Sequence, residues 1–170
     1  MNQIIKTWGI VVAGICIFLW PHEVYSAKKE VPMKINGVIN LTEKEAVEMI
    51  SFCLENNASR RCIFVDPRKK KDLKRGIIRG SVLYECKDEA DFDAVQFLLA
   101  LNKKGYSFQG FDQMQGIDII SGCNGKYCPR SHGFLSAVMK YVGPNAIQQQ
   151  DIKLYWIRQE GIPGMLRIMK

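Results

Sequence analysis

Apolar residues repeat at helical spacing after residue 42, which makes residues 42–55 the clearest predicted helix. Thr42 can cap the amide of Glu45 while the carboxylate of Glu45 reaches back, a pairing typical of helix starts. The apolar positions that follow are Ala46, Val47, Ile50, Cys53 and Leu54. They fall three or four residues apart, so one face of this helix should be buried.

Two further stretches show the same period. Residues 88–102 begin with two possible capping carboxylates, Asp88 and Asp91. Their expected buried stripe is Phe92, Val95, Leu98 and Leu99, with a second apolar face at Ala94, Phe97 and Leu101. Residues 131–142 should form a helix that is capped by Ser131 and ended by a glycine-proline pair. Its expected buried side is Phe134, Leu135, Val138, Tyr141 and Val142.

The other segments are less regular. Residues 28–40 have no sustained period and should be mobile or lie loosely on the body. Residues 62–67 suit a short strand, whereas residues 72–86 favour a helix, although their β-branched residues also suit a strand. Residues 105–130 contain five glycines and predict a long loop. Residues 145–159 suit either a helix or a strand.

The chain begins with a pattern typical of a secretory signal peptide. Lys6 precedes an apolar run over residues 8–20, and a leader of residues 1–27 ends in Ser26-Ala27, where a signal peptidase would cut. The alternative is an uncleaved anchor, but thirteen apolar residues fall short of the ~20 that a bilayer-spanning helix needs. We expect cleavage, no stable membrane insertion, and a single periplasmic domain formed by residues 28–170.

These patterns predict a mainly α fold: a small domain of four to five helices with one or two disulfides and a short β element, with an α+β fold as the alternative. An oxidising compartment favours disulfides over free thiols. The candidates are Cys53, Cys62, Cys86, Cys123 and Cys128. Their number is odd, so at least one has no partner in the chain, and the favoured pair is Cys123 with Cys128.

His132 is the only histidine that follows the leader, and this limits the possible chemistry. A cysteine nucleophile needs a general base within reach, and no further member of a triad is visible beside His132, so we expect no enzyme activity. Cys123, Cys128 and His132 have a C-x4-C-x3-H spacing that could hold zinc, but a closed site needs a fourth ligand. We expect a disulfide there, and neither a metal nor a cofactor.

The formal net charge of +7 is concentrated in one segment. Residues 60–79 hold nine Lys and Arg residues and two Asp residues. This basic run could dock on an acidic protein surface or form a solvated face. We expect no nucleic-acid partner, because no aromatic residue lies between Asp66 and Arg79 to stack on bases.

Two segments carry a family resemblance. The first is Gly76-Ile-Ile-Arg-Gly80, and the second is Tyr127-Cys128-Pro129 followed by Leu135-Ser-Ala-Val-Met-Lys-Tyr-Val142 and Pro144. Together they resemble the Rap/Tai family of periplasmic immunity proteins, which protect bacteria against amidase effectors of type VI secretion. Cys53 on the first predicted helix fits this resemblance too.

The resemblance implies an all-α domain, often dimeric, that blocks a peptidoglycan amidase by inserting a loop into its active-site groove. We therefore expect a periplasmic immunity protein whose partner is an effector enzyme, with a homodimer compatible with the resemblance. The candidate binding residues lie on the predicted loop: Phe108, Phe111, Asp112, Gln113, Lys126 and Tyr127. In the alternative interpretation the two phenylalanines only pin the loop to the core. The alternative function is an accessory component of an envelope secretion or conjugation apparatus.

Overall fold

The fold is built on a parallel β-sheet. A computed structural model describes residues 34–55, 62–149 and 151–170. Within these ranges five strands pair in the order β1-β5-β4-β2-β3, and every pairing is parallel. The strands are β1 (Val38–Leu41), β2 (Cys62–Asp66), β3 (Val82–Leu83), β4 (Asp118–Gly122) and β5 (Lys153–Ile157). The predicted leader of residues 1–27 lies outside the described residues.

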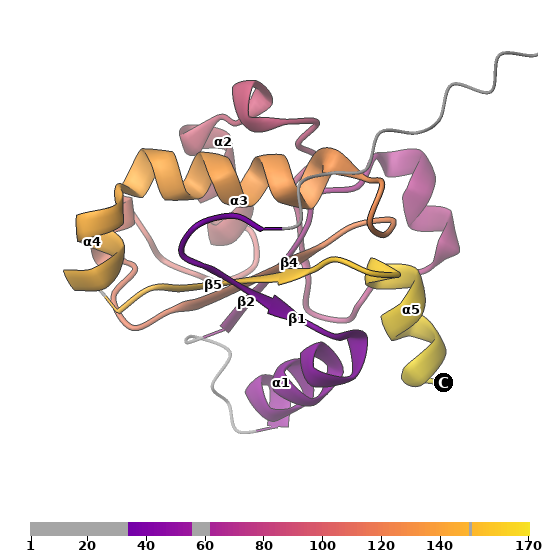
Figure 1. Ribbon diagram of the computed structural model, residues 1–170. Helices are drawn as coiled ribbons and strands as arrows, with labels where there is room; N and C mark the ends of the chain where they lie inside the picture. Colours follow the sequence, from indigo (N-terminus) through magenta and orange to yellow (C-terminus); the bar gives the residue numbers. More distant parts are fainter. Residues whose placement is uncertain (1–33, 56–61, 150) are drawn as a thin grey trace, which may run out of the picture.

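Helices cover both faces of the sheet, which gives three layers (Figure 1). The helices are α1 (Glu43–Glu55), α2 (Ala94–Asn102), α3 (Pro129–Val142), α4 (Pro144–Gln149) and α5 (Gly161–Ile168). The described residues also form three 3-10 turns between these elements: η2 (Lys70–Arg75), η3 (Glu89–Asp91) and η4 (Phe111–Gln113). In the described ranges no helix is both long and apolar enough to span a bilayer.

The predicted mainly α fold is therefore wrong, and so is the all-α fold that the family resemblance implied. The architecture is α/β. The physical reason lies in the inner strands β2 and β4, which are buried on both faces and so lack the alternation of a half-exposed strand. Ile63-Phe64-Val65 in β2 and Ile119-Ile120 in β4 are short continuous apolar runs, which periodicity cannot distinguish from pieces of a buried helix.

The core is divided between the two faces of the sheet. On one face Val65, Ile119 and Trp156 pack in the cluster that includes residues of α2 and α3. On the other face Phe64 and Ile120 pack in the cluster that includes residues of α1 and α5. Neighbouring residues of one strand thus enter different cores, as the pleat requires.

The predicted helix over residues 72–86 is wrong. The chain forms η2, turns, and enters the edge strand β3 instead. Gly76 and Gly80 have φ angles of 113° and 81°, a left-handed region that the interior of a helix excludes. The two glycines therefore serve turns.

Two predicted irregular segments contain strands. The expected loop over residues 105–130 holds the central strand β4, and the expected loose lead over residues 28–40 contributes to the edge strand β1. β1 pairs with β5, from the opposite end of the chain. The prediction failed because β4 has only five residues and glycines surround it.

The most regular predicted helices are confirmed. At the start of α1 the Glu45 amide donates to Thr42 Oγ1 (3.3 Å), and the Thr42 amide donates to Glu45 Oε2 (2.8 Å). α2 starts later than expected, behind Asp93, whose Oδ1 accepts from the Gln96 amide (3.0 Å). The face of α2 that is buried is the second predicted apolar face, and not the expected buried stripe. Phe97 and Leu101 are fully buried, whereas Val95 and Leu99 are 63% and 46% exposed.

The C-terminal third combines confirmed and missed elements. α3 is confirmed but begins at Pro129, two residues before Ser131, so Ser131 is a buried residue of the first turn and not the cap. Tyr141, expected on its buried side, is 61% exposed. Residues 145–159 contain both of the predicted alternatives: a helix, which is part of α4, and then a strand, β5. The sequence did not predict α5.

Candidate thiol site

Two cysteines meet at the carboxyl edge of the sheet. Cys123 directly follows β4, and Cys128 occupies the N-cap position of α3, with a short loop between them. β2 and β4 are neighbours in the sheet. After β2 the chain continues to β3 at one edge, whereas after β4 it continues to β5 on the opposite side. Sites in parallel α/β sheets form at such a reversal of strand order, beyond the carboxyl ends of the strands.

Cys123 is the inner member of this pair. Its side chain is 1% exposed, and its Sγ donates to the carbonyl oxygen of Cys128 (3.2 Å). Ser131 Oγ donates to Cys123 Sγ (3.2 Å), while Trp156 Nε1 donates to Ser131 Oγ (2.9 Å). Burial, with a further contribution from the bond to Cys128, raises the pKa of Cys123 well above its ordinary value. Cys123 therefore stays a neutral thiol at physiological pH.

Cys128 is the outer member and has the opposite character. It is partly exposed, and the neighbouring Cys123 side chain is the largest cause that lowers its pKa, from 9.0 to about 6. The backbone amides of Asn124 and Arg130 and the charge of Arg130 lower this pKa further, while burial opposes them. A thiol at the start of a helix is stabilised as a thiolate by the dipole and the free amides there.

Arg130 holds the neighbouring loops in place. Its guanidinium is buried, and Nη1 lies 3.3 Å from the Cys86 carbonyl oxygen and 3.5 Å from the Pro67 carbonyl oxygen. A carboxylate oxygen of Glu85 lies 3.6 Å from the same nitrogen. Arg130 thus joins the chain that follows β2 and β3 to the first turn of α3, directly beside Cys128.

The C-terminal segment closes the other side of the site. The Ile162 amide donates to the Cys123 carbonyl oxygen (2.8 Å), and the Lys126 amide donates to the Gln159 carbonyl oxygen (2.8 Å). Gly161 has a φ of 61°, and a Cβ there would lie 2.2 Å from the Cys123 carbonyl oxygen, so only glycine fits. The loop between the two thiols is therefore held against α5.

A groove of about 520 Å³ runs between this loop and the loop that follows β5. Its lining residues are Asn124, Gly125, Lys126, Tyr127, Arg158, Gln159 and Glu160. Tyr127 is 48% exposed, and Lys126 Nζ lies 5.0 Å from the centre of its ring. The groove is therefore bordered by Tyr127, the residue that precedes Cys128.

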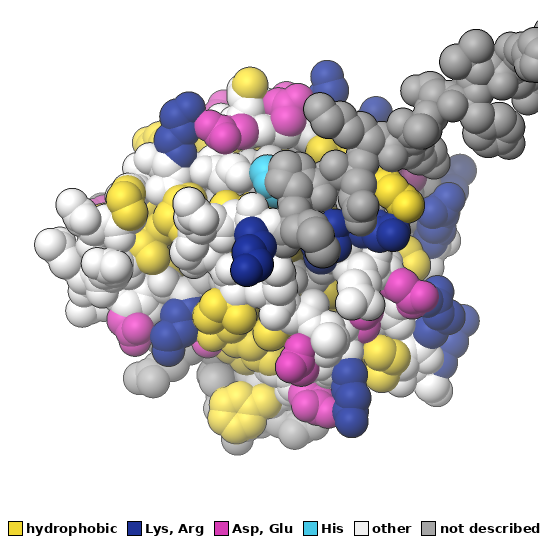
Figure 2. All heavy atoms as spheres, in the orientation of Figure 1, with side chains coloured by type: hydrophobic (Ala, Val, Ile, Leu, Met, Phe, Trp, Pro, Cys, Tyr) yellow, Lys and Arg dark blue, Asp and Glu magenta, His cyan; other side chains and the backbone are white. Residues whose placement is uncertain are grey.

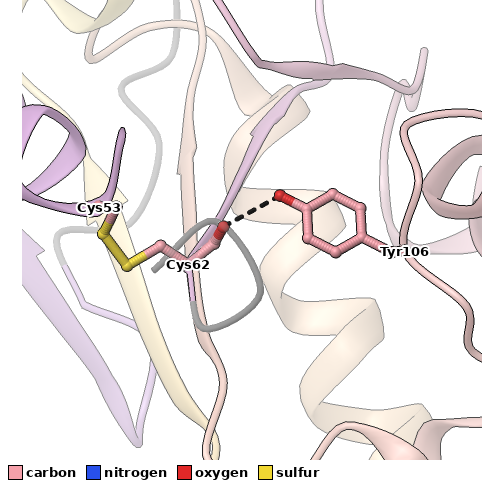
Figure 3. Close-up of a disulfide and its surroundings, with 3 residues drawn as sticks. All are labelled: Cys53, Cys62 and Tyr106. Carbon is pink, nitrogen blue, oxygen red and sulfur yellow. Dashed lines mark hydrogen bonds between the residues drawn. A yellow bond between two sulfur atoms is a disulfide. The ribbon is translucent and has the colours of Figure 1, made fainter. Parts of the chain in front are cut away.

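The sulfur chemistry of the other cysteines is different. Cys53 and Cys62 form a disulfide that joins α1 to the start of β2, with the Cα atoms 6.0 Å apart (Figure 3). Tyr106 Oη donates to the Cys62 carbonyl oxygen (3.1 Å) at this amino edge of the sheet. Cys86 is buried, its Sγ donates to the Asp88 carbonyl oxygen (3.1 Å), and burial is the main cause that raises its pKa to about 12. The disulfide is therefore structural, and Cys86 is an inert thiol.

The favoured disulfide prediction paired Cys123 with Cys128. In the structure both are free cysteines, and Cys123 Sγ donates to the Cys128 carbonyl oxygen. A bridge is present between Cys53 and Cys62, two of the other candidates.

Two alternatives depended on His132: a cysteine nucleophile with His132 as its general base, and a zinc site with Cys123 and Cys128. The His132 ring packs edge-on against Trp156, with the ring centres 5.4 Å apart, and burial lowers its pKa. No hydrogen bond between His132 and a cysteine occurs among the described residues. In the same part of the chain, no group of three or more His, Cys, Asp or Glu side chains is arranged to hold a metal ion.

The predicted binding residues are divided between the two ends of the sheet. Lys126 and Tyr127 line the groove at the carboxyl edge, whereas Phe108 and the η4 residues precede β4 and lie toward its amino edge. Phe111 is 8% exposed and stacks on Phe97, while Phe108 stacks on Tyr106. Both phenylalanines anchor the segment to the core, as in the alternative interpretation. Asp112 and Gln113 are exposed at the same turn.

Sequence reasoning missed Ser131, Trp156 and Arg130 as parts of a site. Each became relevant only through the sheet, which places β5 beside β4 and the start of α3 above both. A cysteine immediately before a helix-starting proline was the one available signal, because it places a thiol at a helix N-terminus.

Comparisons with known proteins leave the site to be interpreted on its own geometry. No family model matches the chain, and no characterised protein matches its sequence.

Proposed function

We propose that this protein carries out thiol–disulfide exchange, with Cys128 as the attacking thiol and Cys123 as the resolving thiol. The observation that carries the proposal is a pair of free cysteines joined by a hydrogen bond from Cys123 Sγ to the Cys128 carbonyl oxygen, in which the Cys128 thiol is partly exposed and the Cys123 thiol is buried. An exposed thiolate with a buried neutral partner is the division of roles that exchange requires.

The exchange proceeds in two displacements. The Cys128 thiolate attacks one sulfur of a substrate disulfide, a mixed disulfide forms, and the other substrate sulfur leaves as a thiolate that takes the proton of Cys123. Cys123 Sγ then attacks Cys128 Sγ, and the second substrate sulfur leaves and takes a proton from solvent. The protein dithiol is oxidised to a disulfide while the substrate disulfide is reduced to two thiols. The same steps in reverse oxidise a substrate dithiol.

Ser131 assists the second displacement. The indole of Trp156 fixes the Ser131 hydroxyl so that its proton points at Cys123 Sγ. A donor in this place stabilises negative charge as it develops on the buried sulfur. Ser131 and Trp156 are therefore positioning residues, and the two cysteines are the reacting groups.

We place this activity in the periplasm, because the leader pattern of residues 1–27 predicts export and disulfides persist in that compartment. Inhibition of a cell-wall amidase stays a prediction from the sequence. The α/β fold removes the structural basis that the family resemblance gave it.

Equilibration of the purified protein in glutathione buffers of defined potential tests the proposal. We expect one two-electron transition, assigned by peptide mass spectrometry to Cys123 and Cys128. Cys86→Ala should leave the transition unchanged, and Cys123→Ala should trap a mixed disulfide on Cys128. If Cys123→Ala accumulates no mixed disulfide and the wild-type pair never forms a bond, the proposal is wrong.

A further inference from the structure

The basic run lies at the same edge of the sheet as the thiol pair. η2 follows β2 directly, so it leaves the carboxyl edge where Cys123 leaves β4. The exposed cations of this segment are Lys69, Lys70, Lys71, Lys74 and Arg75. None of the five forms an ion pair with a carboxylate in residues 34–55, 62–149 or 151–170. In Figure 2, Lys and Arg side chains gather along the right-hand edge, where η2 lies in Figure 1.

A buried ion pair fixes the shape of this segment. Arg68 Nε donates to Asp66 Oδ1 (2.9 Å) and Arg68 Nη2 donates to Asp66 Oδ2 (2.8 Å), with both side chains fully buried. Arg68 Nη2 also donates to the Gly76 carbonyl oxygen (2.7 Å), which lies just beyond η2. One guanidinium therefore holds both ends of the basic segment, so the cations project from a fixed turn.

A second contact joins the basic segment to the loop between Cys123 and Cys128. Asn124 Nδ2 donates to Asp72 Oδ2 (3.1 Å), and Asn124 lies between the two cysteines and lines the groove. The exposed cations of η2 therefore stand beside the groove, which Tyr127, the residue before Cys128, also lines. None of these cations is among the causes that lower the pKa of Cys128, which are Cys123, Asn124 and Arg130.

We infer that the substrate of the thiol site is a protein segment that carries acidic residues next to its reacting cysteines. The inference rests on the proposed exchange activity and names its substrate class. The exposed cations of η2 attract such a segment and orient it along the groove, so that a substrate sulfur meets Cys128. Complementary charge of this kind raises association rates by about 10- to 1,000-fold at low ionic strength.

Three synthetic peptides with one common disulfide test this inference, with flanking residues that are all Glu, all Ser or all Lys. The reduced protein should react with the Glu peptide at least about 10-fold faster than with the Lys peptide at low salt. The advantage should shrink toward unity at about 0.5 M salt, because exposed charges are then screened. The Ser peptide should react at an intermediate rate.

Two matched double variants separate the effect of charge at η2 from the effect of the protein's net charge. Lys70→Glu/Lys71→Glu changes η2, whereas Lys103→Glu/Lys104→Glu makes the same change in net charge beyond α2, at exposed positions away from the thiols. The first variant should lose most of the preference for the Glu peptide, and the second should keep it. The rate with the neutral Ser peptide should stay within about twofold in Lys103→Glu/Lys104→Glu, since these positions lie away from the thiols and the groove.

The outcomes distinguish the two proposals. Equal rates with all three peptides, or equal effects of the two double variants, would overturn the inferred acidic substrate and leave exchange itself intact. Failure of the wild-type protein to exchange with any of the peptides would overturn the exchange activity, and the substrate inference with it.

Discussion

The thiolate of Cys128 gives the most direct quantitative prediction. Its pKa of about 6 lies well below the ordinary cysteine value of 9.0. At pH 7 such a thiol is about 90% ionised, compared with about 1% for an ordinary cysteine. A more acidic thiolate is also a weaker nucleophile, by about 15- to 30-fold over this pKa range. The net advantage at pH 7 is therefore only about 3- to 6-fold.

Lower pH reveals the effect more clearly. At pH 5 the folded site keeps about 9% thiolate, whereas an ordinary cysteine keeps about 0.01%. With the same loss of nucleophilicity, Cys128 should react about 30- to 60-fold faster than a cysteine with the ordinary pKa. A measurement at neutral pH alone would miss most of this difference.

The assay follows alkylation of Cys128 by iodoacetamide between pH 4 and pH 10, with the labelled peptide quantified by mass spectrometry. The same chain in denaturant supplies the reference with the ordinary pKa. The native rate should reach half its maximum near pH 6 and the denatured rate near pH 9. Cys123→Ala should move the native midpoint upward, because it removes the largest cause of the shift, and Cys86→Ala should not. A native midpoint above about pH 8 would refute the assignment of Cys128 as the attacking thiolate.

Three further predictions concern the stability of the fold and use the contacts of Ser131, Arg68 and Cys128. Ser131→Ala leaves the buried indole N–H of Trp156 without its acceptor and should reduce the free energy of unfolding by about 1–3 kcal/mol in urea titrations. Arg68→Met leaves the buried Asp66 carboxylate unpaired and should cost about 3–5 kcal/mol, whereas the double variant Arg68→Met/Asp66→Leu should recover most of that loss. Because folding lowers the pKa of Cys128, the reduced protein should lose stability as the pH falls from 9 through about 6, while the form with a Cys123–Cys128 bond should not show this loss.

The sequence predicted the elements whose own residues define them. α1 has a complete capping box at Thr42 and Glu45, and α3 has a long amphipathic period that ends at Gly143, so local chemistry was sufficient for both. β2 was also predicted from its apolar run before Pro67. These elements would be recognisable in any fold.

The parallel sheet could not be predicted in this way. β3 has two residues and β1 has four, and each is a strand only because a neighbour supplies its hydrogen bonds. Ile119-Ile120 in β4 carries no periodicity, since both faces of that strand are buried. Pairings between distant segments decide the fold, and these pairings leave almost no local pattern.

The candidate site shows the same division. The proximity of Cys123 and Cys128 followed from their spacing, and the structure brings the two side chains together. Their opposite acidities depend on burial, on the start of α3 at Pro129 and on the Arg130 guanidinium, none of which the spacing specifies. The sequence thus located the pair, and the tertiary structure determines its chemistry.

The parallel pairing of β1 with β5 bears on how the protein is made. A ribosome releases β1 long before β5, and each residue of β1 has its partner in β5. Sheets that depend on such distant partners form slowly and late. The sheet therefore cannot be completed until β5 has left the ribosome, long after β1.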